Sequence, residues 1–149
     1  MKTANPYLNF PGNTREAFEF YRSVFGGEFV DVLRFRDMGD TMGVPESQLD
    51  GIAHISLPLG AGNILMGTDQ PESWGQPLRP GNNFYIAIEA DDADEADRLF
   101  AGLSAGGRVE MALEKTDWAE KYGSCVDRYD VQWMVMYTGD VQFSPGQGS

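Results

Sequence analysis

Hydrophobic residues recur at helical spacing in two segments of the chain. In residues 13–27, NTREAFEFYRSVFGG, apolar side chains fall three or four positions apart, with Asn13 or Thr14 able to cap the first amides and glycines at the end. Residues 91–107, DDADEADRLFAGLSAGG, show the same stripe, with acidic residues in the first turn and again two glycines at the end. The pattern predicts two amphipathic helices of similar length.

Short apolar or alternating runs flank both predicted helices, as is typical of β-strands. One run precedes each helix, at residues 6–10 and 82–90. Three runs follow each helix, at residues 28–35, 52–59 and 63–67 in the first half and at 108–113, 123–127 and 132–138 in the second. Each half is therefore predicted to be β-α-β-β-β, and a repeat of this length indicates two equivalent modules joined by the Pro/Gly-rich segment 70–81.

A sheet that carries a helix on one face needs cover for its other face. We therefore expect an α+β protein in which the helices lie on the outer faces and the two remaining sheet faces curl toward each other around one cup.

Several phrases of the sequence resemble a known family. These are PYLNF followed by GNTREAFEFYRSVFGGE, then AHISLPLG and NILMGTD, and in the second half GNNFYIAIEADDADEADRLFAGLSAGGRVEMAL. They are similar to the PhnB-like branch of the vicinal oxygen chelate superfamily, which includes glyoxalase I, extradiol dioxygenases and bleomycin-resistance proteins.

The resemblance covers about residues 4–138 and implies a glyoxalase-like fold with a cup-shaped mixed sheet. It implies one domain over residues 1–143, made of modules at about 4–69 and 82–139, and it also implies a homodimer. The Gly/Ser/Pro-rich residues 144–149 are predicted to be a disordered tail.

Metal-using members of the superfamily take four ligands, one from each of four cup strands. Carried over to this chain, these positions fall on Pro6, on Ser56 or (after a two-residue slip) His54, on Tyr85 and on Val135. A divalent cation needs several convergent carboxylate or imidazole ligands, and at most one is present in this set. We therefore expect neither a metal nor another cofactor.

Alternation along the strands predicts which side chains line the cup. The predicted face mixes aromatic and polar groups, a composition typical of a small-molecule pocket, although the rings could instead simply fill the cup. Met134 and Met136 are predicted on the opposite face, under the helix. The predicted ligand-binding residues are His54, Ser56, Tyr85, Glu89, Trp133 and Tyr137 on the strands, with Trp118 and Tyr122 in a loop that covers the mouth of the cup in the PhnB-like branch.

Two of these residues are candidates for proton transfer. His54 is the only histidine of the chain, and a carboxylate beside it, such as that of Glu89, would raise the pKa of its imidazole and form an acid–base pair. The alternative is that His54 donates to a backbone carbonyl and is buried for packing.

Composition narrows the range of partners. The 149 residues carry a formal net charge of −12 and no cluster of lysine and arginine, so nucleic acid is not an expected partner. Cys125 is the single cysteine, which excludes an internal disulfide. The N-terminal residues lack the apolar core of a secretory signal, and no run approaches 18 apolar residues, which predicts a cytoplasmic protein without a membrane partner.

Three functions stay open on this basis. The leading prediction is metal-independent binding of a small organic ligand in the cup, as the resemblance implies for a bleomycin-resistance-type protein. The second is a metal-dependent lyase, isomerase or dioxygenase with non-standard ligands, and the third is metal-free acid–base catalysis by His54 with Glu89 or a tyrosine. Methyl transfer, a label that some relatives carry, is not expected, because the glycines of residues 60–62 lie between two predicted strands and open no helix.

Overall fold

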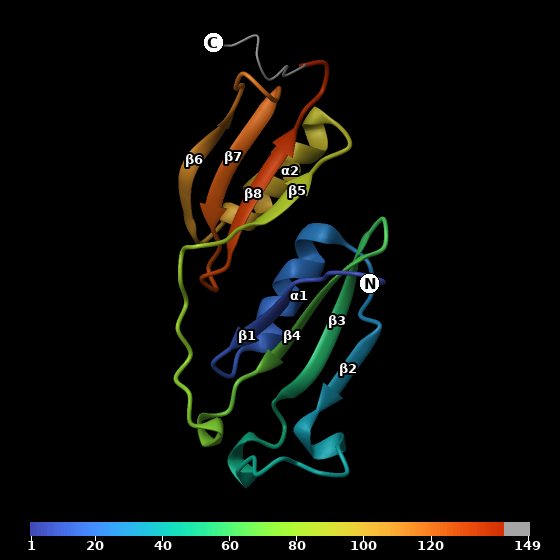
Figure 1. Cartoon of the computed structure of the whole chain (residues 1–149), viewed down its shortest axis with the longest axis vertical. Helices are drawn as coiled ribbons and strands as arrows, with labels where there is room; N and C mark the ends of the chain where they lie inside the picture. Colours follow the sequence, from blue (N-terminus) through green and yellow to red (C-terminus); the bar gives the residue numbers. More distant parts are fainter. Residues whose placement is uncertain (142–149) are drawn as a thin grey trace. The chain divides into compact units, whose positions relative to one another are not determined.

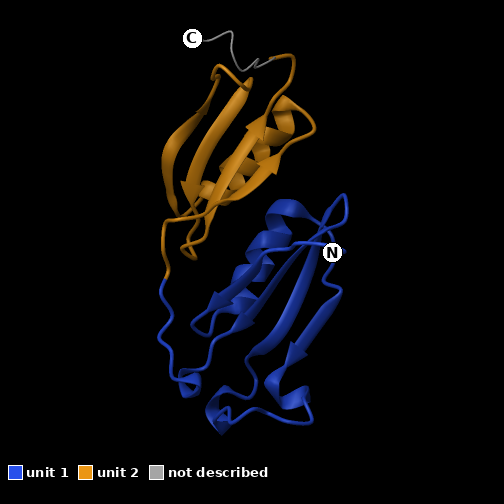
Figure 2. Ribbon diagram, in the orientation of Figure 1, with its two compact units in different colours: residues 1–79 blue, residues 80–149 orange. Residues whose placement is uncertain are grey.

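The chain forms two compact units, Met1–Arg79 and Pro80–Ser149 (Figure 2). The computed structural model describes residues 1–141, so the predicted tail at 144–149 lies outside the described residues. No helix within residues 1–141 combines the length and the apolar character needed to cross a bilayer.

Each unit has one helix and one four-stranded mixed sheet, which confirms the predicted α+β repeat (Figure 1). The elements of the first unit are β1 (Tyr7–Phe10), α1 (Thr14–Phe25), β2 (Asp31–Arg34), β3 (Ile52–Gly60) and β4 (Asn63–Asp69), with short 3₁₀ turns at Phe35–Asp37, Glu46–Gln48 and Glu72–Trp74. The elements of the second unit are β5 (Ile86–Glu89), α2 (Ala93–Ser104), β6 (Arg108–Glu114), β7 (Lys121–Val126) and β8 (Gln132–Tyr137).

The two sheets have the same topology. Their strand orders are β1-β4-β3-β2 and β5-β8-β7-β6. In each sheet the first strand pairs in parallel with the last strand of the unit, and the other pairs are antiparallel. The sequence repeat is therefore a structural repeat.

The helix of the first unit packs on one face of its sheet through four buried side chains, Ala17, Phe18, Tyr21 and Val24. The Phe18 ring lies so close to β4 that a Cβ at Gly67 would stand 2.6 Å from its Cε1 atom. Since real Cβ atoms do not approach a ring that closely, this position requires glycine.

The helix of the second unit packs on β7 and β8 through Ala96, Leu99, Phe100 and Leu103. Two β8 side chains under it, Trp133 and Val135, are 0% exposed. The indole Nε1 of Trp133 donates to the buried carboxylate of Asp127 at 2.8 Å, which satisfies the polar atom of an otherwise apolar core.

The two helices begin differently. At α2 the side chain of Asp92 accepts a hydrogen bond from the Glu95 amide at 2.7 Å, which is an N-cap of the predicted kind. At α1 the N-cap residue Asn13 makes no such bond. The Thr14 amide donates instead to Asp69 at the end of β4, at 3.0 Å, so a carboxylate from the sheet satisfies this helix end.

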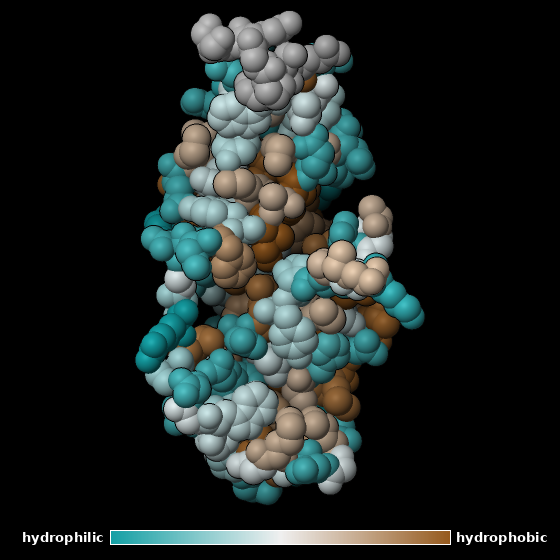
Figure 3. Space-filling model, in the orientation of Figure 1, coloured by the Kyte–Doolittle hydropathy of each residue, from teal (hydrophilic) through white to brown (hydrophobic). Residues whose placement is uncertain are grey.

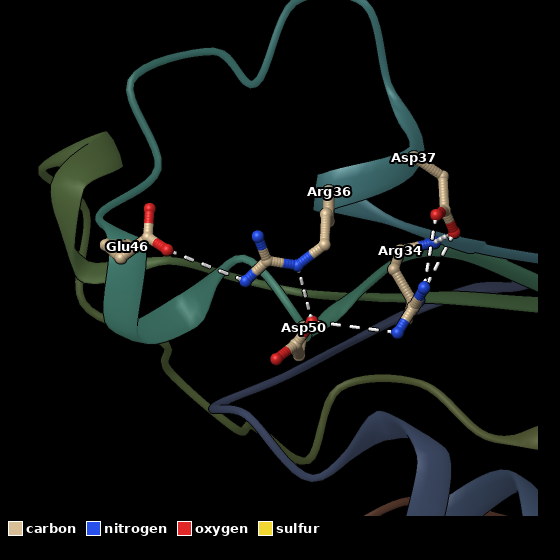
Figure 4. A network of polar contacts seen from close by, with 5 residues as sticks. All are labelled: Arg34, Arg36, Asp37, Glu46 and Asp50. Carbon is tan, nitrogen blue, oxygen red and sulfur yellow. Dashed lines mark hydrogen bonds and ion pairs between the residues drawn. The ribbon is translucent and has the colours of Figure 1, made fainter.

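The two units differ most in one connection. In the first unit β2 and β3 are joined by residues 35–51, which include two 3₁₀ turns, whereas in the second unit residues 115–120 join β6 and β7. Arg36 holds the longer connection together by donating to Asp50 at 2.8 Å and by an ion pair with Glu46 at 3.8 Å (Figure 4). Arg34 pairs with Asp37 at 3.3 Å within the same network.

Candidate functional site

The sheet of the first unit has one face that α1 does not cover, and polar side chains gather there. Tyr7 on β1 is paired with Met66 on β4, Met66 with Ser56 on β3, and Ser56 with Asp31 on β2. Strand alternation places this row, and the neighbouring His54, opposite to the buried Ile55, Leu57 and Leu65. We call this surface the first open face.

The imidazole of His54 has a tyrosine as its partner. The Tyr7 hydroxyl lies 3.1 Å from His54 Nδ1, and the two rings are tilted with their centroids 5.7 Å apart. Burial raises the pKa of Tyr7, and the Thr68 side chain partly offsets this effect. This hydrogen bond joins two strands across the face, and while a tyrosine was one of the expected partners of His54, Tyr7 was not the residue identified.

The other predicted residues of this unit take separate positions. Ser56 is buried and donates through Oγ to Asp31 at 3.1 Å. Pro6 precedes β1, and its carbonyl accepts the Met66 amide at 3.1 Å, so the group that the first strand presents beside His54 is Tyr7 and not Pro6.

The second unit also has an uncovered sheet face, with more aromatic and sulfur-containing side chains. The pairings Ala87 with Met134 and Glu89 with Met136 place both methionines on this face. Tyr122 is paired with Met136, and its hydroxyl contacts Met134 Sδ at 3.2 Å. In the view of Figure 3, hydrophobic residues lie among pale and hydrophilic ones over β7 and β8. We call this surface the second open face.

Two further contacts shape the second open face. The Tyr85 hydroxyl donates to the Glu110 carboxylate of β6 at 2.7 Å. This hydrogen bond, followed by burial, raises the pKa of Tyr85. The Trp118 ring stands edge-on to Tyr122 with the centroids 5.3 Å apart, and Trp118 stays 43% exposed. A carboxylate, two phenols and an exposed indole therefore lie on one side of this unit.

The prediction that Trp133, Val135 and Tyr137 share this face is wrong. Trp133 is paired with Ile86, and Tyr137 with Lys121, whose Nζ reaches Asp97 of α2 at 2.9 Å. This row therefore lies on the α2 side. The segment QWMVMY is apolar at nearly every position, so alternation could not identify its buried side, and a shift of one residue exchanges the two faces.

The carboxylate of Glu89 has a structural contact in this unit. Its Oε1 accepts the Thr138 amide at 3.0 Å, just after the end of β8. The predicted pairing of Glu89 with His54 would join the two units and stays a prediction, as does the common cup.

The donor atoms within each unit do not fit the metal of the superfamily. Among residues 1–141, no group of three or more His, Cys, Asp or Glu side chains could hold a metal ion. On the first open face, His54 and Asp31 are each hydrogen-bonded to a neighbouring hydroxyl. A divalent cation would need more carboxylate or imidazole ligands than either face gathers.

Sequence reasoning missed several groups of these faces. Tyr7 was missed because the register was placed on Pro6, and the β8 methionines were missed through the same kind of shift. Glu110 was missed because no face was assigned to the run 108–113, where a register irregularity between Val109 and Met111 also breaks simple alternation.

Comparison with known proteins agrees with this architecture. A family model described as 3-demethylubiquinone-9 3-methyltransferase matches residues 2–136. The protein YjdN of Escherichia coli K12 is 28% identical over 145 residues, which cover 88% of this chain and 92% of YjdN.

Two solved structures share the fold over nearly the whole chain. The protein PA1353 of Pseudomonas aeruginosa is 36% identical with a TM-score of 0.81, over 91% of this chain and 96% of that one. The PhnB protein of Bacillus cereus is 24% identical with a TM-score of 0.66, over 91% and 98% of the two chains.

Proposed function

Because the chain belongs to the 3-demethylubiquinone-9 3-methyltransferase family, in the PhnB-like branch of the vicinal oxygen chelate superfamily, we propose that it binds a small organic ligand without a metal. The observation that carries this proposal is the second open face, where Trp118, Tyr122, Tyr85 and Glu110 lie together.

The chemistry of this face favours a flat ligand that carries a positive charge or hydrogen-bond donors. The rings of Trp118 and Tyr122 offer an apolar surface with electron-rich faces, which attracts aromatic groups and organic cations. Met134 and Met136 have flexible thioether side chains that adapt to the shape of a bound molecule. The Glu110 carboxylate supplies the acceptor that orients the ligand, and the net charge of −12 attracts cations over a longer range.

Two features support binding over metal chemistry or methyl transfer. The side chains of the open faces that could ligate a metal, such as His54 and Asp31, are hydrogen-bonded to neighbouring hydroxyls. Within each unit of the described chain they are also too few to hold a metal ion. The glycines that could suggest a nucleotide loop, Gly60 and Gly62, have φ of 103° and 82° in the turn between β3 and β4, and this turn opens no helix.

The test is a titration of the protein with 1-naphthylmethylammonium, in which isothermal titration calorimetry measures the dissociation constant. We expect saturable binding that Trp118→Leu and Tyr122→Leu each weaken about tenfold, because each removes a ring from the contact surface. Phe29→Leu is the control, since Phe29 is an aromatic ring of the other unit that lies against Arg15 and Arg22 of α1. Equal affinity in Trp118→Leu, Tyr122→Leu and wild type would contradict the proposed site.

Two further measurements test the role of the ligand's positive charge and the independence from metal ions. Glu110→Gln should weaken binding of the ammonium compound about threefold to tenfold but leave the neutral alcohol 1-naphthylmethanol unaffected. The affinity should also stay within about twofold in EDTA and after addition of Zn²⁺, Ni²⁺ or Mn²⁺. A tenfold gain with any of these metals would refute metal-independent binding.

A further inference from the structure

The first unit contains a cavity that is separate from its open face. It has a volume of about 310 Å³ and lies where the turn before α1, the 35–51 connection and the end of β4 meet. Its lining includes Gly12, Phe35, Gln48, Gly51, Asp69 and Glu72. This volume is in the range of small-molecule pockets. We call it the α1 cavity.

The charge of the α1 cavity is negative. Among residues 1–141, three carboxylates line it, those of Asp50, Asp69 and Glu72, and no lysine or arginine does. Asp50 is held by Arg36 at 2.8 Å (Figure 4), and Asp69 accepts the amides of Thr14 and Ile52. Glu72 has neither an ion pair nor a side-chain hydrogen bond among the described residues. An anionic ligand is therefore disfavoured, and one wall offers an unpaired carboxylate.

One residue of the lining has a buried oxygen atom without a partner among the described residues. Gln48, which lines it, has a buried Oε1 without a hydrogen bond among the described residues. Asn13 Oδ1 and Thr14 Oγ1 are also buried without a hydrogen bond among the described residues, but neither residue lines the cavity. A buried acceptor without a donor is unfavourable, so Gln48 Oε1 offers a ligand in this cavity an unsatisfied hydrogen-bond acceptor.

The shape of the cavity depends on a glycine. A Cβ at Gly51 would lie 2.9 Å from Asp69 Oδ2 and 3.1 Å from the Gln48 carbonyl oxygen, so any larger residue would intrude on this wall. Phe35, Pro11 and Pro71 supply apolar surface beside the oxygen atoms. The lining thus combines hydrogen-bond acceptors with room for a short hydrocarbon chain.

We propose that the α1 cavity is a second binding site, which takes the ammonium group of a primary alkylamine. An ammonium group has three donors and no acceptor, which matches Gln48 Oε1 and the Glu72 carboxylate. The positive end of α1 does not oppose the cation, because Asp69 already accepts its Thr14 amide. A divalent metal does not fit, since residues 1–141 contain no suitable cluster of ligands.

The test is a ¹H–¹⁵N NMR titration of the full chain with n-butylammonium chloride at constant ionic strength. We expect saturable shifts at the amides of Gly12 and Gly51 and at the side-chain amide of Gln48. The neutral n-butanol and the anionic butyrate should shift these signals at least about tenfold less at equal concentration, because they lack the charged donor. Equal shifts with n-butanol, or shifts confined to Trp118, Tyr122 and Glu110, would overturn the proposal.

Two variants identify the groups that bind the amine. Glu72→Gln and Gln48→Leu should each raise the dissociation constant for n-butylammonium at least about threefold. Glu46→Gln is the matched control, because Glu46 is an exposed carboxylate of the same connection that does not line the cavity. The spectrum of each variant shows whether it is folded. An equal loss in Glu46→Gln and Glu72→Gln would show that general charge attracts the amine and would refute the site.

Discussion

Single residues of the second unit show how burial changes the chemistry of a side chain. Cys125 is 0% exposed in β7, paired with Trp133 of β8. Burial raises the pKa of its thiol to about 11, and the nearby carboxylates of Asp127 and Glu110 add to this effect. At neutral pH the thiol is therefore protonated and a poor nucleophile, as expected for a structural cysteine.

This shift predicts a dependence of stability on pH. Below about pH 8.5, near the pKa of a thiol in an unfolded chain, the thiol is protonated in both states and its contribution is complete. As the pH rises toward 11 the unfolded chain loses the proton first, so the free energy of unfolding falls, by about 1–3 kcal/mol in total.

The measurement is urea unfolding of wild type and Cys125→Ala at several values between pH 7.5 and 11. Lysines and tyrosines titrate in both proteins, so the difference between the two curves isolates the thiol. A difference that stays constant over this range would show that Cys125 ionises equally in the folded and unfolded chains.

At the scale of elements, the two helices predict opposite outcomes for the same kind of substitution. Asp92→Ala removes the side-chain cap of α2 and should lower the free energy of unfolding by about 1 kcal/mol. Asn13→Ala removes a side chain that caps nothing, and its buried Oδ1 has no partner among the described residues. This substitution should change stability by less than about 0.5 kcal/mol or increase it slightly.

Thermal and urea unfolding of both variants at pH 7 measures these differences. Destabilisation by Asn13→Ala as large as by Asp92→Ala would mean that Asn13 caps α1 in solution, contrary to the hydrogen bond between Thr14 and Asp69.

Elements were predictable from sequence where their pattern had one interpretation. The helices expected at 13–27 and 91–107 occur as Thr14–Phe25 and Ala93–Ser104, because their apolar stripes have a single period. Strand β8 was located correctly but its faces were exchanged, because Met, Val, Trp and Tyr can occupy either side of a sheet. The α1 cavity could not be foreseen, since it depends on contacts between three segments distant in sequence.

At the scale of the whole molecule, charge is the main property that no single element explains. The formal net charge is −12, and in every described ion pair at least one side chain is more than a third exposed. Such pairs contribute about 0–1 kcal/mol each, whereas unpaired carboxylates repel one another throughout the folded chain.

Salt should therefore stabilise the protein. Raising NaCl from about 20 to 200 mM should raise Tm by about 2–5 °C, because screening weakens the net repulsion more than it weakens the exposed pairs. Circular dichroism at 222 nm measures this shift. Tetramethylammonium chloride at the same ionic strength is the control for specific binding of sodium, and a lower Tm at high salt would mean that the ion pairs dominate.

The unequal connections of the two units carry an evolutionary consequence. Residues 35–51 and 115–120 occupy equivalent places in two copies of one scaffold, yet only the longer one helps to form the α1 cavity. If the units arose by tandem gene duplication, insertion or deletion has altered one copy while the strand order of both was preserved. Duplication would thus have allowed the two halves to diverge in this connection, so that a cavity formed beside one helix has no counterpart in the same place of a copy with the shorter connection.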